Sequence, residues 1–325
     1  MTILVTGAAG FIGFHTCQTL LKRGEHVIGI DNLNDYYDVK LKQARLAQLQ
    51  ANKSFKFYPL DIANRTAIEN LVKEHSNISR IVHLAAQAGV RYSLVNPYAY
   101  TEANTTGHLT ILEACRALPN LEHLVYASSS SVYGANQKLP FSVTDPVEKP
   151  ISLYAATKRN CELMSYTYSH LFQIPATGLR FFTVYGPWGR PDMSAFIFTK
   201  AILEEKPISV FNHGDMRRNF TYIEDIVRGI LGCLDKPPAN MSVPHRLYNI
   251  GNNRSEPLMD FIHTLENHIG KKAIIQFEPM QPGDVKETIA DITDTTRDFG
   301  FLPRTNIDEG LKNFIDWYKQ FYGIK

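Results

Sequence analysis

Short apolar runs alternate with longer amphipathic segments over the first half of the chain. The short runs predict buried strands at residues 3–6, 27–31, 55–61, 81–85, 124–128 and 176–182. Segments with helical spacing of apolar positions lie between them, at residues 11–23, 39–50, 65–75, 98–118 and 153–172. Because strand and helix alternate, we predict an α/β fold with a doubly wound parallel sheet covered by helices on both faces.

The alternation breaks after about residue 182. Proline and glycine become frequent, as in residues 186–191, and shorter strands and helices follow before an amphipathic helix at residues 307–322. We therefore predict two domains. Residues 1–182 form the large sheet domain, residues 183–325 form mainly a smaller α/β domain, and segments around 222–250 return to the first.

Composition limits the classes of function. The chain has 325 residues, 44% of them hydrophobic and 20% charged, with a formal net charge of +2. This balance argues against nucleic-acid and membrane-surface partners. The four cysteines are far apart, and no apolar run is long enough to span a bilayer. We expect reduced, buried thiols in a cytoplasmic protein, and no metal site.

A glycine-rich turn follows the first predicted strand and opens the first predicted helix. Gly7, Gly10 and Gly13 permit a tight turn and let the backbone approach a pyrophosphate at the helix N-terminus. This spacing alone is weak evidence, because many glycines only make turns. The next strand ends in Asp31, whose carboxylate can bind a ribose diol and would repel a 2′-phosphate. We therefore expect NAD rather than NADP, with a strand-end loop cap as the alternative role of Asp31.

Other strand ends meet at the same edge of the predicted sheet, where ligands bind in open parallel sheets. At the third strand, Asp61 and Ile62 are placed to meet the adenine. At the fourth strand, a segment of small residues lets the backbone lie close to the pyrophosphate and the nicotinamide ribose. That segment is Leu84, Ala85, Ala86 and Gln87.

The fifth strand ends in a run of four serines, and the following helix begins near Tyr154 and Lys158. The tyrosine and the lysine are four positions apart, so they share one helix face. The lysine cation stabilises the phenolate form of Tyr154, and Ser129 can bond the reacting substrate oxygen. Taken separately, each motif has another interpretation. A tyrosine and a lysine at this spacing are also common on a helix surface, and a run of serines is also common in a polar turn. Together, after a dinucleotide site, they predict hydride chemistry at a carbinol.

With these motifs, the whole chain resembles the extended short-chain dehydrogenase/reductase (SDR) family of nucleotide-sugar enzymes. Within it, three stretches look like UDP-glucuronate 4-epimerases: DNLNDYYD at 31–38, AAQAGVRYS at 85–93 and RFFTVYGPWGRPDM at 180–193. The resemblance implies a Rossmann-type fold, bound NAD, Tyr154 as base, Lys158 as its electrostatic helper and Ser129 as hydrogen-bonding partner. It further implies interconversion of UDP-glucuronate and UDP-galacturonate through a 4-keto intermediate, with transient reduction of bound NAD. Such a reaction belongs to polysaccharide precursor biosynthesis.

The resemblance also implies a substrate site. Arg218 matches the family's diphosphate arginine, Arg190 and Thr183 match positions that meet the sugar carboxylate, and Gln281 and Asp284 resemble nucleotide contacts. A surface charge is the alternative for Arg190. The helices at residues 98–118 and 153–172 are where this family forms a two-fold four-helix interface, so we expect a homodimer.

Further residues are expected to contact the cofactor or the substrate. We expect the cofactor also to meet Phe11, Ile12, Asn32, Asn104, Ser128 and Phe181, and the substrate also to meet Arg91 and Ser130.

The serine run separates this chain from related activities. Related 4,6-dehydratases have Asp-Glu where this chain has Ser130 and Ser131, and related decarboxylases have Glu at the second position. Hydroxyls there favour epimerisation. Two alternatives stay open: a UDP-glucose or UDP-N-acetylglucosamine 4-epimerase, against which Thr183 and Arg190 weigh, and a non-catalytic NAD-sensing protein, against which the retained Tyr154 and Lys158 weigh.

Overall fold

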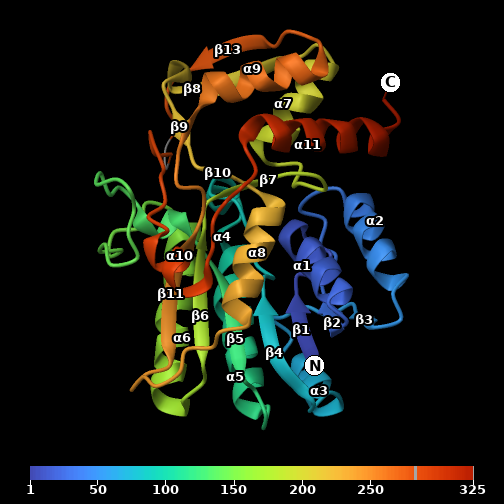
Figure 1. The fold of residues 1–325 in the computed structure, drawn as a ribbon, viewed down its shortest axis with the longest axis vertical. Coiled ribbons are helices and arrows are strands. Elements are labelled where there is room, and N and C mark those ends of the chain that lie inside the picture. The colour runs from blue at the N-terminus through green and yellow to red at the C-terminus, as the bar shows by residue number, and fades with distance from the viewer. Residues whose placement is uncertain (282–283, 325) are drawn as a thin grey trace.

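The computed structural model describes residues 1–281 and 284–324, and its centre is a parallel sheet of seven strands in the order β11-β6-β5-β4-β1-β2-β3 (Figure 1). The predicted doubly wound α/β fold is confirmed. The strands are β1 (Thr2–Thr6), β2 (His26–Ile30), β3 (Phe55–Tyr58), β4 (Ile78–His83), β5 (His123–Ser129), β6 (Ala176–Phe181) and β11 (His245–Ile250).

Side chains alternate between the two faces of the sheet, and each face has its own apolar core. In β1, Ile3 and Val5 join one cluster and Leu4 joins the other. Helices α1 (Phe11–Lys22), α2 (Val39–Gln50) and α8 (Ile223–Leu234) cover the first face. Helices α3 (Arg65–Glu74), α5 (His108–Ala117) and α6 (Leu153–Phe172) cover the second.

A smaller unit stands over the carboxyl-terminal edge of the sheet (Figure 1). Its helices are α7 (Ser194–Leu203), α9 (Leu258–Ile269) and α11 (Ile307–Tyr322). Three two-stranded sheets complete it, which pair β7 (Thr183–Tyr185) with β10 (Phe220–Tyr222), β8 (Pro207–Phe211) with β13 (Ile274–Glu278), and β9 (Arg217–Arg218) with β12 (Glu256–Pro257). Between β10 and β12 the chain passes through α8 and β11, and after β13 it forms α10 (Thr293–Phe299), which packs on both of these elements.

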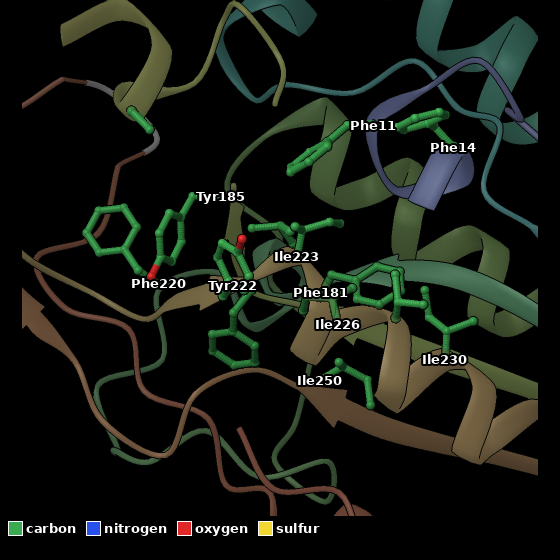
Figure 2. Close-up of a cluster of buried hydrophobic side chains, with 14 of the residues drawn as sticks. Phe11, Phe14, Phe181, Tyr185, Phe220, Tyr222, Ile223, Ile226, Ile230 and Ile250 are labelled. Atoms are coloured by element: carbon green, nitrogen blue, oxygen red, sulfur yellow. The ribbon is translucent and has the colours of Figure 1, made fainter. Parts of the chain in front are cut away.

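The first apolar core continues from the large sheet into this smaller unit. In Figure 2, Phe181 at the end of β6 lies near Ile223 and Ile226 of α8, with Tyr222 and Phe220 beyond them. The Phe220 ring stacks on Phe261 of α9 with centroids 4.2 Å apart. This continuous packing holds the smaller unit against the edge where the strands end.

Three predicted segments differ in their bounds. The strand predicted at residues 55–61 ends at Tyr58. Strand β4 begins at Ile78, three residues before the predicted start. The polar residues Ser79 and Arg80 interrupt the apolar pattern, but β1 pairs with Ile78 and Arg80 and so extends the strand. The predicted helix at 98–118 is a composite: α4 (Pro97–Tyr100), a π-helix (Thr101–Gly107) and then α5.

All four cysteines are free and buried, as expected. Over residues 1–281 and 284–324, no helix combines the length and the apolar character that a membrane span requires.

Candidate active site

A cavity of about 390 Å³ runs along the carboxyl ends of the strands, and most of the predicted site residues line it. It joins the glycine turn, the ends of β2 to β6 and the beginning of α6. The predicted residues in its wall are Gly7, Gly10, Phe11, Ile12, Gly13, Asp31, Asn32, Asp61, Ile62, Leu84, Ala85, Ala86, Gln87, Ser128, Ser129, Ser130, Tyr154, Lys158, Phe181, Thr183 and Arg190.

The glycine turn is shaped by contacts that allow no side chain. Gly7 has φ +71°, and a Cβ there would lie 2.9 Å from the amide nitrogen of Ala85. A Cβ on Gly13 would overlap the carbonyl oxygen of Gly7. Helix α1 starts directly after Gly10 without a side-chain cap or an acidic residue in its first turn. Its first amides therefore offer hydrogen bonds and a positive dipole end to an anion in the cavity.

Asp31 lines the part of the cavity next to the glycine turn. Its carboxylate accepts from the amides of Ala9 (3.1 Å) and Leu33 (2.8 Å), so it caps the loop and also faces the cavity. Burial raises the pKa of Asp31, while these amides and the nearby Lys42 act in the opposite direction. Each carboxylate oxygen keeps acceptor capacity for a ribose hydroxyl. The wall of the cavity thus fits the phosphates and the diol of a dinucleotide.

Sequence reasoning missed two cations of α2 beside this site. Lys42 lines the cavity, and its Nζ donates to the main-chain and side-chain oxygens of Asn34. Arg45 is fully buried and donates to the carbonyl oxygens of Ala9 (2.9 Å) and Trp188 (2.6 Å). It therefore ties the glycine turn to the loop that carries Arg190. Their spacing of three residues beside apolar positions of α2 was the available signal.

The three predicted catalytic residues all line the cavity. Helix α6 begins where Ser152 caps the amide of Ala155, which brings Tyr154 to the first turn and Lys158 to the second. Lys158 is 4% exposed and its Nζ donates to the carbonyl oxygen of Ala127 at 3.0 Å. Ser129 ends β5 and its Oγ accepts from the amide of Ser131 at 3.1 Å. A hydroxyl, a phenol and an ammonium therefore face one space.

A buried ion pair between Glu162 and Arg180 connects helix α6 to the strands that end at the cavity. Glu162, one turn after Lys158, accepts two bonds from the Arg180 guanidinium, at 2.8 and 3.0 Å. Both side chains are 1% exposed. The same carboxylate accepts from the Ser128 hydroxyl at 2.7 Å and from Arg159 at 2.9 Å. The helix with Tyr154 is thus joined to the ends of β5 and β6.

Arg190 and Thr183 line the cavity on the side of the smaller unit. Arg190 is not free: its Nε donates to Asp192 Oδ1 at 3.0 Å, and its Nη2 bonds Oδ2 of the same carboxylate. Burial opposes the charged form of Arg190, but Asp192 more than offsets this, so the net pKa of the guanidinium is raised.

Five predicted residues lie outside the cavity wall. Asn104 sits in the π-helix, where its side chain bonds the backbone N–H and carbonyl of Gln87 and the hydroxyl of Thr157. It therefore positions the cofactor loop and α6. The other four belong to or lie near the smaller unit. Arg91 pairs with Asp284 at 3.1 Å, Arg218 donates to the carbonyl of Lys286 at 3.0 Å, and Gln281 is half-buried.

Comparisons with known proteins agree over nearly the full chain. Residues 3–251 match the NAD dependent epimerase/dehydratase family. A probable UDP-glucuronate 4-epimerase of Rhizobium meliloti is 43% identical over 99% of this chain and 98% of that protein. UDP-glucuronate 4-epimerase 4 of Arabidopsis thaliana is 45% identical over 99% of this chain and 76% of that protein.

A solved structure shows the same architecture. The UDP-glucuronic acid 4-epimerase of Bacillus cereus, in complex with UDP-glucuronic acid and NAD, superposes with a TM-score of 0.92. It is 37% identical and the match covers 99% of this chain and all of that chain.

Proposed function

The chain belongs to the NAD-dependent epimerase/dehydratase family, and within it we propose that the protein is a UDP-glucuronate 4-epimerase that interconverts UDP-glucuronate and UDP-galacturonate. The observation that carries this conclusion is one cavity that joins a dinucleotide cradle, the Tyr154–Lys158–Ser129 set and the Arg190 guanidinium. Bound NAD supplies the hydride acceptor and donor for C4 of the sugar.

The residues of this chain handle the proton and the orientation of the sugar. Tyr154 holds a phenolic oxygen that would take the proton from the C4 hydroxyl and return it to the same oxygen when hydride comes back to the opposite face of C4. Lys158 lines the same cavity as Tyr154, and its bond to the Ala127 carbonyl oxygen anchors its charge there. Ser129 Oγ accepts from the Ser131 amide and donates to the Ser131 hydroxyl, and its proton would turn to the reacting oxygen when the sugar binds. The 4-keto sugar must turn between the two half-reactions.

The cavity supplies no acid–base pair for elimination of water. Among the described residues in its wall, the carboxylates are Asp31 and Asp61, and both belong to the cofactor end. Ser130 and Ser131 offer only hydroxyls near Tyr154. This supports a reaction confined to oxidation and reduction at C4.

We assign the nucleotide-sugar contacts mainly to residues 183–325, and the cofactor contacts to residues 1–182 with the returning segments α8 and β11. Arg190 and Thr183 border the cavity where the sugar C6 would lie. Arg218, Arg91 and Asp284 form a charged group close to the bridge between β9 and Glu287, which suits a diphosphate and its nucleoside.

We also propose that the protein forms a homodimer through helices α4, α5 and α6. Apolar side chains are exposed on the outer faces of α4, α5 and α6, among them Tyr98 (82% exposed), Leu109, Leu163 and Tyr166 (51% exposed). A second copy covering these helices would bury them in a four-helix interface. Light scattering of the purified protein should give twice the chain mass.

An Arg190→Ala variant tests the substrate assignment. Loss of a charged hydrogen bond from a desolvated site costs about 1.5–3 kcal/mol, or roughly one to two decades in affinity. We expect kcat/KM for UDP-glucuronate to fall by that factor, with much less change in the binding of UDP. Equal weakening of UDP would assign Arg190 to the diphosphate. Comparable wild-type turnover of UDP-glucose would favour a UDP-hexose 4-epimerase instead.

A further inference from the structure

Asp192 lies outside the cavity wall but is bonded to two residues that line it, Arg190 and Tyr36. Its carboxylate bonds Arg190 through two parallel contacts, and the two side chains are only 27% and 23% exposed, respectively. A pair in this geometry is weakly screened and is close to neutral as a unit. The positive charge that a uronate would meet is therefore largely cancelled before any substrate arrives.

Tyr36 and Gly89 fix the position of this pair. The Tyr36 hydroxyl donates to Asp192 Oδ2 at 3.1 Å, and Tyr36 also lines the cavity. Burial, together with the Asp192 charge, raises the pKa of Tyr36 to about 12, so the hydroxyl keeps its proton and remains a donor. A Cβ on Gly89 would lie 2.9 Å from that hydroxyl and 3.6 Å from Asp192 Oδ2. Three loops thus converge on one carboxylate.

The remaining guanidinium donors determine what a substrate can gain. Arg190 has five N–H groups, of which Asp192 engages two, so the others can turn to the cavity. A sugar carboxylate can bond them, but it also meets the negative charge of Asp192. This competition weakens the hold on the uronate and leaves the binding of UDP untouched.

We propose that Asp192 is a specificity-determining residue. It weakens the interaction between Arg190 and the sugar carboxylate enough for the 4-keto sugar to turn. The inference rests on the proposed function. A full charge at Arg190 would hold one orientation of the sugar too firmly, and a missing charge would not select a uronate. The Arg190–Asp192 pair lies between these limits.

The Asp192→Asn variant tests this assignment, because asparagine keeps the size and one acceptor oxygen and removes the charge. We expect UDP-glucuronate to bind about tenfold more tightly, as for one charge in a partly buried site. We also expect kcat to fall, since turning slows, while the Kd of UDP stays within about twofold. An unchanged Kd of UDP also shows that the variant is folded.

A double-mutant cycle with Arg190→Ala shows whether Asp192 acts through Arg190. Asp192→Asn should tighten the binding of UDP-glucuronate less in the Arg190→Ala background than in the wild type, because the two N–H donors released from Asp192 exist only where Arg190 is present. The proposal is overturned if Asp192→Asn weakens or leaves unchanged the binding of UDP-glucuronate, or if the tightening is as large without Arg190 as with it. Wild-type conversion of UDP-glucuronate, followed separately by NMR, reports on the proposed function itself, so the two failures are distinguishable.

Discussion

Replacing Glu162 by glutamine should destabilise the protein far more than the loss of an ordinary ion pair. Glu162 and Arg180 are both 1% exposed, and the carboxylate accepts from Arg180, Arg159 and Ser128. Glutamine has nearly the same shape but no charge, and its amide nitrogen can accept none of these bonds. The substitution leaves the Arg180 cation buried with a neutral partner.

The expected size follows from this burial. Breaking a buried pair by removing one partner costs about 3–5 kcal/mol, because the other charge is left uncompensated. Burial opposes ionisation of Glu162, yet Arg180, Ser128 and Arg159 outweigh it and lower its pKa in the folded state. A depressed carboxyl pKa gives stability that is present above the unfolded value of about 4.3 and is lost as pH falls through the folded value. The difference between wild type and variant should therefore shrink below about pH 4.

Urea unfolding at pH 7 and at pH 3 measures both effects, with Glu69→Gln as the matched control. Glu69 pairs with Arg65 on the surface of α3, where the two side chains are 43% and 78% exposed. That variant should lose no more than about 0.5 kcal/mol. If Glu162→Gln lost as little as the control, or if its deficit did not depend on pH, the stabilising role of the buried pair would be refuted.

Three further outcomes are expected from the cavity. Tyr154→Phe should keep the fold and the cofactor and lose at least the roughly 10²–10⁴-fold of a general acid–base group in kcat; near wild-type turnover would remove Tyr154 from the mechanism. Ser129→Ala should cost less in the same assay, because that hydroxyl only orients the reacting oxygen, and a larger loss would give it a role in proton transfer. Denatured wild type should release NAD or NADH, whereas Gly13→Ala, whose Cβ would overlap Gly7, should release little of either; NADP at comparable occupancy would contradict the role of Asp31.

Element boundaries could be predicted best where a side chain marks the start of a helix. Helices predicted at residues 39–50, 153–172 and 307–322 have those same bounds in the structure, and each follows a capping side chain: Asp38, Ser152 and Asn306. The π-helix at Thr101–Gly107 could not be predicted, because its sequence TEANTTG has one apolar side chain, Ala103, and therefore no apolar period that separates a π-helix from an α-helix.

Site residues could be predicted where they belong to one local sequence motif. Contacts between loops that are distant in the sequence could not be predicted. The glycine turn, Asp31 and the Tyr154–Lys158 pair are local patterns, and the fold brings them to one cavity. The contact of Arg45 with Trp188 spans 143 positions, and no local pattern predicts it. The Arg190–Asp192 pair is only two residues apart, but its alignment depends on the turn that follows β7.

The central claim is reversible inversion at C4 of UDP-glucuronate by a protein that already holds its cofactor. Purified protein should be incubated with UDP-glucuronate deuterated at C4, without added NAD, and the sugars analysed by NMR. We expect UDP-galacturonate to form and to retain the deuterium at C4, because the cofactor stays bound while the label leaves C4 and returns. Failure to form UDP-galacturonate, or its formation with loss of the label, would contradict this mechanism.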